Sequence, residues 1–556
     1  MTRVLFVFFF IETLLAFPLW AQRTVGVLSY DPDLSFPGYN LLYPLNQPNV
    51  YLLDNCGRIV HVWEDEADFR PGVTAYLLPD GKLVKTKRPS FFAADPIWAG
   101  GGGATVEIRD WDNNLLWSFT QNDSLRRLHH DVQVLPNGNI LMISWELKTQ
   151  DEAIAAGRDP ALLNEEVLWP DYILEVDPLT DSIVWEWHAW DHLIQDYDST
   201  KANYGVVEDH PELIDVNWDT NDGKADWMHV NFIDYNEEYD QIMISVPTFN
   251  EFWVIDHSTT KAEAAGHTGG LAGRGGDLLY RWGNPATYRR GTATDQKLFF
   301  QHDTHWIDDF IDPDAPLYGK VALFNNRAGA NFSTAHVLSL PFDPVSWTYP
   351  MEGLTWGPSS FDVTLMYPDD STRMYSNIVS SVQVLPNGNF LVCVGRWGYS
   401  FEITPQQQIV WEYVTPLANG QPVNQGDSLH INQNLTFNIK RYPADYAAFQ
   451  GKDLSPKGYI ELNPDTTFCD QLLPTTELGV FTALKLYPNP TTDLLVLEWL
   501  DEASSGIVAI YDILGREMLR WHSREGRRKY VDVSGWLSGV YLVKVDGYVA
   551  HKVLVY

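Results

Sequence analysis

Short stretches in which apolar and polar residues alternate recur along the chain. They occur in pairs that are joined by a turn and often end in tryptophan. Alternation with a period of two is typical of strands that bury one face, so each pair predicts two strands of a sheet. The pairs span residues 50–63, 106–117, 172–187, 252–282, 337–347 and 401–413. Six such units predict an all-β fold, a six-bladed β-propeller over residues 25–465.

A second repeated string fixes the register of the units. Leu-Pro-Asn-Gly occurs at residues 135–138 and again at 385–388, and both copies predict a hairpin turn. When the two turns are aligned, His130 falls opposite Ser380. The fifth unit, which is expected to close at 346–347, is the most degenerate of the six.

Three histidines occupy matching positions in three successive units. His130, His229 and His302 each precede a stretch that predicts a strand. The innermost strand of every blade starts at the same end of a propeller's central channel, so the pattern predicts that the three imidazoles meet at one mouth. Imidazoles that converge without cysteine ligands favour acid, base or nucleophilic chemistry.

Composition narrows the possible partners. The 556 residues carry a formal net charge of −35, which excludes nucleic acid, because phosphate binding needs clustered Lys and Arg. The three cysteines lack metal-ligand spacing and are too few for a disulfide framework; one bridge is possible, but buried free thiols are expected. Glycines 100–103 predict a loop, since no phosphate-binding Lys-Ser/Thr follows. The sequence predicts no cofactor and no metal.

Both ends of the chain predict segments outside the propeller. Arg3 and the apolar run after it predict an export signal over residues 1–21, and no other segment is long and apolar enough to span a membrane. Residues 466–480 predict a linker. Residues 481–556 predict a separate small β-sandwich.

The C-terminal unit carries three distinctive strings. They are Tyr-Pro-Asn-Pro at 487–490, Tyr-Asp-Ile-Leu-Gly-Arg at 511–516 and Gly-Val-Tyr-Leu-Val-Lys at 539–544. With these strings the unit resembles the C-terminal sorting domain of the type IX secretion pathway of Bacteroidetes. The resemblance implies that the type IX machinery is a partner and that the protein is secreted or held at the cell surface.

The propeller portion carries four strings of its own. They are His-His-Asp at 129–131, Asp-Trp-Met-His-Val-Asn at 226–231, Gln-His-Asp at 301–303 and Phe-Asn-Asn at 324–326. In these strings the chain resembles the bacterial arylsulfate sulfotransferases, which need no nucleotide sulfate donor. The resemblance implies a six-bladed propeller that moves a sulfuryl group from an aryl sulfate ester to a phenol through a sulfohistidine.

The same resemblance implies residue roles. His302 would be the nucleophile, while His229 and His130 would bind the sulfuryl oxygens and handle protons. The further candidates for substrate binding are His129, Asn231, Arg327 and Arg396.

One position departs from the family pattern. An arginine is expected in the strand after Ser245, about eighteen residues beyond the histidine of the His-Val-Asn string, but Pro247 stands there. Proline has no charge and no backbone N–H. Arg281, Arg327 and Arg396 are the candidates to replace the missing cation.

Two other classes of function remain open from the sequence. The recurring Asp-to-Trp spacing is similar to that of quinoprotein dehydrogenases, although these normally have eight blades and would leave the histidines unexplained. A surface-displayed propeller that binds a ligand without catalysis is the second alternative, and Pro247 is its best support.

Overall fold

The computed structural model describes residues 24–90, 95–466, 469, 484–499, 507–512, 516–522, 528–545 and 548–555. Strands hold 43% of the chain and helices 7%, so the all-β prediction is confirmed. The chain divides into two compact units, residues 1–465 and 466–556. The predicted signal peptide and most of the predicted linker lie outside the described residues.

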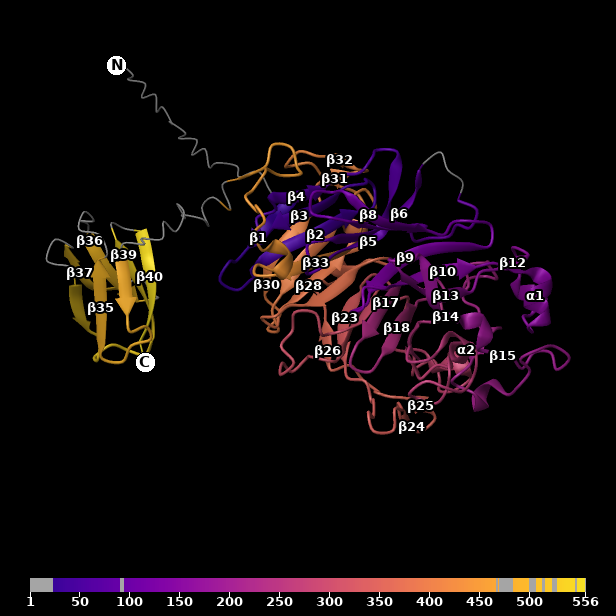
Figure 1. The fold of residues 1–556 in the computed structure, drawn as a ribbon. Coiled ribbons are helices and arrows are strands. Elements are labelled where there is room, and N and C mark those ends of the chain that lie inside the picture. The colour runs from indigo at the N-terminus through magenta and orange to yellow at the C-terminus, as the bar shows by residue number, and fades with distance from the viewer. Residues whose placement is uncertain are drawn as a thin grey trace, which may run out of the picture. The chain divides into compact units, whose positions relative to one another are not determined.

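The larger unit contains six antiparallel sheets of four or five strands (Figure 1). The first three are, in spatial order, β33 (Thr436–Pro443), β2 (Gly38–Pro44), β3 (Val50–Asp54) and β4 (Ile59–Trp63); β5 (Phe69–Leu77), β6 (Leu83–Ser90), β7 (Thr105–Arg109) and β8 (Leu115–Thr120); and β9 (Arg126–Val134), β10 (Ile140–Glu146), β13 (Asp171–Asp177) and β14 (Ser182–His188).

The other three sheets follow in chain order. They are β17 (Phe232–Asn236), β18 (Gln241–Val246), β19 (Glu251–Asp256) and β20 (Tyr280–Trp282); β21 (His302–Trp306), β22 (Val321–Asn325), β23 (Thr334–Leu338) and β26 (Val363–Leu365); and β27 (Ser381–Val384), β28 (Phe390–Val394), β29 (Tyr399–Ile403) and β30 (Ile409–Val414), with β1 (Gly26–Tyr30) added beyond β30.

Short elements decorate these sheets. They are the helices α1 (Gln150–Ala155) and α2 (Lys261–Ala264), and the strand pairs β11 (Lys148–Thr149) with β12 (Val167–Leu168), β15 (Leu193–Ile194) with β16 (Ile214–Asp215), β24 (Met351–Glu352) with β25 (Thr355–Trp356), and β31 (Leu417–Ala418) with β32 (Gln421–Pro422). A capping box begins each helix, at Thr149 and at Thr260.

The first strands of the six sheets pack in a closed ring, in the order β33, β5, β9, β17, β21, β27 and back to β33. Aspartates join neighbours in this ring. Asp131 accepts the amide N–H of Ile233 at 3.3 Å, and Asp303 accepts that of Val382 at 2.6 Å. A buried carboxylate that accepts backbone N–H groups fixes the spacing of adjacent strands. The ring is what brings residues of distant units to one axis.

The recurring tryptophans have a shared role. The indole N–H of five of them donates to an oxygen of the next sheet. The pairs are Trp63 with Asp110, Trp117 with Asp181, Trp187 with Gly276, Trp282 with Pro358 and Trp411 with Asn55. Trp63, Trp187 and Trp411 are also fully buried. In five of the six units, the tryptophan that marks the sequence pattern therefore makes a contact that holds one sheet to the next.

The fifth sheet differs from its predicted unit. Its fourth strand is β26, not the predicted Ser346-Trp347. The hairpin of β24 and β25 intervenes, and Trp347 lies outside the strands with a φ of 54°. Where the other sheets use an indole N–H, the hydroxyl of Tyr367, just beyond β26, donates to Glu412 of the sixth sheet at 3.2 Å.

Strands from the two ends of the larger unit pair with strands from the opposite end. The repeat pattern does not predict these pairs. The first sheet takes its innermost strand, β33, from the end of the unit, while β1 from its start pairs with β30 of the sixth sheet. Long-range strand pairs of this kind leave no local signal in the sequence.

The expectation about the cysteines is wrong in part. Cys393 is a buried free thiol, as expected, but Cys56 and Cys469 are disulfide-bonded. Their separation in the sequence gives no spacing from which a pairing could be predicted.

The smaller unit consists of two antiparallel sheets. They are β34 (Leu484–Tyr487), β35 (Leu494–Trp499) and β38 (Arg528–Asp532); and β37 (Glu517–His522), β36 (Ile507–Asp512), β39 (Gly539–Val545) and β40 (Tyr548–Val555). Side chains of both sheets share one hydrophobic core, which includes Leu495, Ile510 and Val543.

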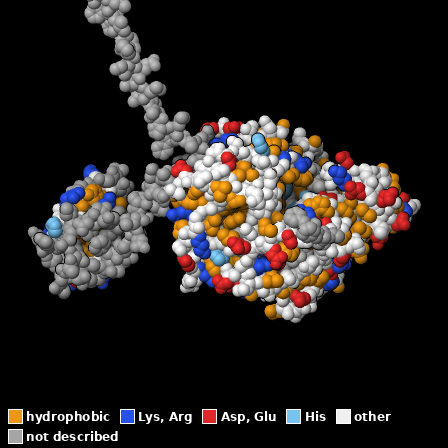
Figure 2. All heavy atoms as spheres, turned by 90° about the horizontal axis from the view of Figure 1, so that it is seen from above, with side chains coloured by type: hydrophobic (Ala, Val, Ile, Leu, Met, Phe, Trp, Pro, Cys, Tyr) orange, Lys and Arg blue, Asp and Glu red, His pale blue; other side chains and the backbone are white. Residues whose placement is uncertain are grey.

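Acidic and basic side chains are interspersed on the face of the larger unit that Figure 2 displays. Among the described residues, no helix has the length and apolar character needed to cross a membrane.

Candidate active site

The structure brings the three predicted histidines together. His130 lies in β9, His229 stands just before β17, and His302 begins β21. The ring centroids of His130 and His229 are 4.7 Å apart. The Phe437 ring of β33 lies beside His130 and His302, with its centroid 6.1 Å and 5.9 Å from theirs. Three successive first strands thus deliver three imidazoles to one place.

Unusual backbone geometry aims two of these side chains. His130 has a φ of 50° and His229 a φ of 56°, in the left-handed region that residues with a side chain rarely adopt. The pairing of β9 with β10 shifts register at this point, which is typical of a β-bulge. Strained residues of this kind persist where the surrounding structure holds them, and they concentrate at functional sites.

His229 is paired with a carboxylate. Its Nδ1 lies 2.6 Å from Asp226 Oδ2, so Nδ1 carries a proton and donates it. Burial disfavours the charged imidazole, but the Asp226 carboxylate outweighs burial and raises the pKa of His229 above its ordinary value. His229 is therefore the member of the group that favours the imidazolium form.

His302 has the opposite character. Burial, and after it the charges of His229 and Arg327, lower its pKa to about 3, despite an opposing hydrogen bond from Asn326. Its Nδ1 is 2.8 Å from Asn326 Oδ1. The Asn326 amide nitrogen donates to two backbone carbonyls, so its oxygen is the acceptor and His302 Nδ1 is the donor. Nε2 is left with the lone pair, which accepts the Val379 N–H at 3.1 Å.

His129 and His130 form a second relay. Their Nδ1 atoms are 2.8 Å apart, and His129 Nε2 lies 2.8 Å from Asp171 Oδ1. His129 Nε2 makes no hydrogen bond among the described residues, so the Nδ1–Nδ1 contact is the hydrogen bond that joins His129 to His130. Burial also raises the pKa of Asp171 well above its ordinary value. Burial lowers the pKa of both imidazoles well below the ordinary value. The His129 ring stacks on Trp145 at 3.8 Å, behind His130.

Asn231 is fully buried and engaged within the protein. Its amide nitrogen donates to the Gln301 carbonyl at 2.9 Å, directly before His302. Asn231 therefore contacts the backbone directly before His302.

Arg327 and Arg396 meet at Asn377. Arg327 Nε donates to the Asn377 carbonyl at 3.1 Å, and the Arg396 guanidinium contacts the Asn377 side chain. Arg327 also lies over the Phe300 ring, 3.7 Å from its centroid. Because Phe300 in turn contacts His229 and His302, Arg327 is a cation at the edge of the histidine cluster.

Arg281 and Pro247 are placed elsewhere. Arg281 is fully buried and its guanidinium binds Glu251 at 2.6 Å and Thr287 at 2.9 Å. These contacts occupy it within the fourth sheet and exclude it as a replacement for the missing cation. Pro247 lies in the turn that follows β18, where its carbonyl accepts the Asn250 N–H.

Arg127 is a further cation near the histidines, and the sequence pattern does not single it out. It is fully buried in β9, pairs with Asp95 at 3.0 Å, and its charge adds to burial in lowering the pKa of His130. Its NH1 has no hydrogen-bond partner among the described residues. Its position directly before Leu128-His129-His130 was the available signal.

The predicted glycine loop covers the histidines. Residues 100–103 form neither helix nor strand, and the Gly102 carbonyl accepts the His130 N–H at 2.8 Å. A Cβ on Gly101 would overlap the His130 ring, and one on Gly100 would lie 3.1 Å from His229. Glycine is therefore required for this loop to lie against both imidazoles.

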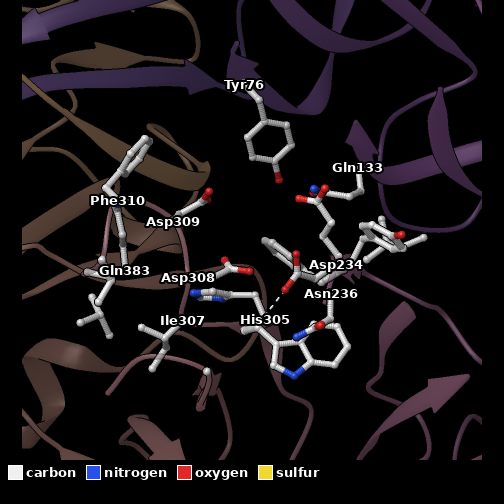
Figure 3. Close-up of a pocket in the computed structure, with 18 of the residues that line it drawn as sticks. Tyr76, Gln133, Asp234, Asn236, His305, Ile307, Asp308, Asp309, Phe310 and Gln383 are labelled. Atoms are coloured by element: carbon white, nitrogen blue, oxygen red, sulfur yellow. Dashed lines mark hydrogen bonds between the residues drawn. The ribbon is translucent and has the colours of Figure 1, made fainter. Parts of the chain in front are cut away.

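A cavity of about 1450 Å³ lies along the ring of first strands. All six strands line it, and Tyr76, Asp234, His305 and Asp308 point into it (Figure 3). The three catalytic candidates do not line it. Phe232 lines the cavity and stacks on Phe437 at 5.3 Å, so an apolar pair separates this space from the histidines.

Comparison with known families decides the identity of the larger unit. The sequence matches the family described as Arylsulfotransferase (ASST) over residues 40–424. The chain belongs to the arylsulfotransferase family. The fold of this arylsulfotransferase is all-β and propeller-like. A search of curated proteins finds no match.

The arylsulfotransferase also carries an export signal at its other end. Residues 485–554 match the secretion system C-terminal sorting domain. The type IX pathway therefore exports the protein, which is secreted or held at the cell surface.

Solved structures resemble the arylsulfotransferase only weakly. A protein of unknown function from Bacteroides caccae has a TM-score of 0.37 at 11% identity, covering 73% of this chain and 98% of its own. A streptogramin B lyase scores 0.33 at 10% identity, covering 73% and 86%. The WD40 domain of Toxoplasma gondii coronin scores 0.31 at 8%, covering 80% and 96%. Scores this low carry no argument about function.

Proposed function

We propose that this arylsulfotransferase moves a sulfuryl group from an aryl sulfate ester to a phenol through a sulfohistidine on His302. The scaffold is a six-bladed propeller, followed by a β-sandwich that serves export. The observation that carries the proposal is the opposite protonation preference of two neighbouring imidazoles, His302 and His229. Titratable groups pushed apart in this way mark nucleophile and acid.

In the first step, His302 Nε2 attacks sulfur, an N–S bond forms and the S–O bond to the aryl group breaks. The phenolate that leaves takes the proton of the His229 imidazolium. Neutral imidazole is a good nucleophile, and Asn326 keeps the proton of His302 on Nδ1, away from the attacking atom. The attack requires the Val379 N–H to leave Nε2, after which that N–H is available for a sulfuryl oxygen.

In the second step, an acceptor phenol returns its proton to His229 and attacks sulfur. The N–S bond breaks and His302 is restored, so the two halves balance.

A loose transition state places charge on the sulfuryl oxygens, as in phosphoryl transfer. Fixed cations and N–H donors stabilise such charge. Arg327 supplies the cation in place of the arginine missing at Pro247, since it lies beside Phe300 and acts on both histidines. His129, Asn231 and Arg396 hold the surrounding framework.

Turnover of a chromogenic aryl sulfate with a phenol acceptor tests the proposal. The wild-type chain should release the phenol with ping-pong kinetics, and His302→Ala should lose activity to background. His210→Ala is the matched control, because His210 is exposed and contacts Glu212. If no phenol is released across a broad set of donors, the proposal fails and a propeller that only binds its ligand is favoured.

A further inference from the structure

A second histidine cluster lies where the insertion between β19 and β20 meets the segment after β14. His192 follows β14 of the third sheet, while His267 and Asp277 belong to the insertion. His192 Nδ1 lies 2.9 Å and His267 Nδ1 2.7 Å from the same oxygen, Asp277 Oδ1. One ligand-type atom from each residue lies within 4.8 Å of the other two.

Proton positions in this cluster point to a cation. His192 Nε2 is 2.9 Å from the Ala264 carbonyl, which can only accept, so Nε2 carries the proton. In a neutral imidazole the lone pair is then on Nδ1, where it faces the lone pairs of Asp277 Oδ1. Either an additional proton or a metal ion must lie between them. An imidazole whose second N–H donates to a backbone carbonyl is the usual arrangement of a metal-binding histidine.

The packing around His192 is that of a built site. His192 is fully buried and Asp277 is 7% exposed. Trp187 stacks on the His192 ring with an interplanar angle of 6° and donates its indole N–H to the Gly276 carbonyl at 2.7 Å. A Cβ on Gly276 would lie 2.6 Å from His192 Nε2. The glycine therefore lets the insertion approach the imidazole closely, while the His267 side chain stays 60% exposed.

We propose that His192 Nδ1, His267 Nδ1 and Asp277 Oδ1 bind one Zn²⁺, with water as the fourth ligand. Two imidazoles favour zinc over calcium or magnesium, which prefer oxygen ligands. Tetrahedral zinc is held by nitrogen and carboxylate oxygen at about 2.0–2.2 Å, which places two ligand atoms about 3.4 Å apart. Each histidine Nδ1 now lies 2.7–2.9 Å from Asp277 Oδ1, so these two contacts lengthen when the ion binds. The ion fastens the glycine-rich insertion of the fourth sheet to the third sheet. Local spacing does not predict this site, because the three ligands lie far apart in the chain, at residues 192, 267 and 277.

The test uses the full chain, stripped with chelator and dialysed against ZnCl₂. Bound zinc is counted by elemental analysis, and thermal unfolding is followed with and without the metal. The wild type should hold one more zinc per chain than His267→Ala, and zinc should raise the Tm of the wild type but not that of His267→Ala. His267 is exposed, so this variant should fold. Any zinc bound by the separate catalytic histidines is the same in the wild type and in His267→Ala, so it cancels in this difference.

His210→Ala, at an exposed histidine outside the cluster, should keep the zinc and the Tm shift. X-ray absorption should report nitrogen and oxygen ligands at zinc distances. Equal zinc content in the wild type and His267→Ala, or a Tm that zinc does not change, would overturn the proposal. The cluster would then be a hydrogen-bonded triad with a charged His192.

Discussion

Each histidine of the candidate active site is defined by the group that holds its second ring nitrogen. Asp226 holds His229, Asn326 holds His302 and His129 holds His130. A carboxylate stabilises an imidazolium, whereas the hydrogen bond to the Asn326 amide oxygen fixes the tautomer of His302 and raises its pKa by less than burial lowers it. The chemistry therefore depends on three partners as much as on the imidazoles.

Replacing Asp226 with asparagine tests this division of roles. The raised pKa keeps His229 protonated to higher pH, so the rate should fall only as pH rises through that pKa. Asp226→Asn removes the charge that raises the pKa, and the basic limb of kcat should move to lower pH. At alkaline pH kcat should drop about 10²-fold, the usual size of an acid–base contribution.

The pH–rate profile should show no acid limb from His302 between neutral pH and pH 4, because its pKa is about 3. Glu212→Gln, at the exposed pair with His210, is the control and should leave the profile unchanged. A basic limb that stays in place in Asp226→Asn contradicts the role of His229.

The sequence predicts the histidines but not all of their partners. Register alone brought His130, His229 and His302 to one mouth. Asn326 was visible only as part of a family string, and Val379 and Phe437 come from other sheets with nothing to distinguish them. Contacts of this kind depend on how the ring closes, which local pattern does not encode.

At the level of elements, the sequence pattern predicts the strands correctly where paired strands are neighbours along the chain. Five of the six predicted units end as expected, whereas the fifth was misassigned because a hairpin separates β23 from β26. The closing strand β33 and the outer strand β1 were not predicted, since their partners lie at the other end of the unit. The glycine loop at 100–103 was predicted as a loop, but its position over the histidines was not.

Gly101→Ala tests whether that loop shapes the site. Gly101 has a φ of 82°, so alanine there is strained, and its Cβ would also displace His130. Misplacing a catalytic group by about 1 Å can lower the rate about 10²-fold. We expect a loss of kcat of that order, measured with a chromogenic aryl sulfate.

Gly138→Ala is the matched control. Its φ is 88° and a Cβ there meets nothing within 4 Å. Both variants should lose about 1–2 kcal/mol of stability from backbone strain, but only Gly101→Ala should lose activity. Equal activity in the two variants contradicts a role for the loop.

For the whole molecule, the indole contacts between sheets matter most where the ring closes. Trp411 of the sixth sheet donates to the Asn55 carbonyl of the first at 2.8 Å and is fully buried. The sorting domain at 485–554 serves export. The arylsulfotransferase match and the sorting-domain match therefore fall in different units of the chain.

Trp411→Phe tests the closure. The change keeps an aromatic ring but leaves the buried Asn55 carbonyl without its donor, which costs about 1–3 kcal/mol. Urea unfolding should show that loss in the free energy of unfolding. Trp117→Phe, whose indole contact with Asp181 is exposed, should lose less. An equal effect of the two changes contradicts the closure argument.

The most direct test of the central claim is the mass of the enzyme quenched during turnover of an aryl sulfate. We predict an adduct of one sulfuryl group, located on His302 by peptide mapping, absent in His302→Ala and discharged by added phenol. Mapping is decisive because His130 and His302 both lie beside the Phe437 ring, and His302 Nε2 accepts the Val379 N–H in the free enzyme. An adduct on His130, or rapid phenol release with no adduct on any histidine, would contradict the account.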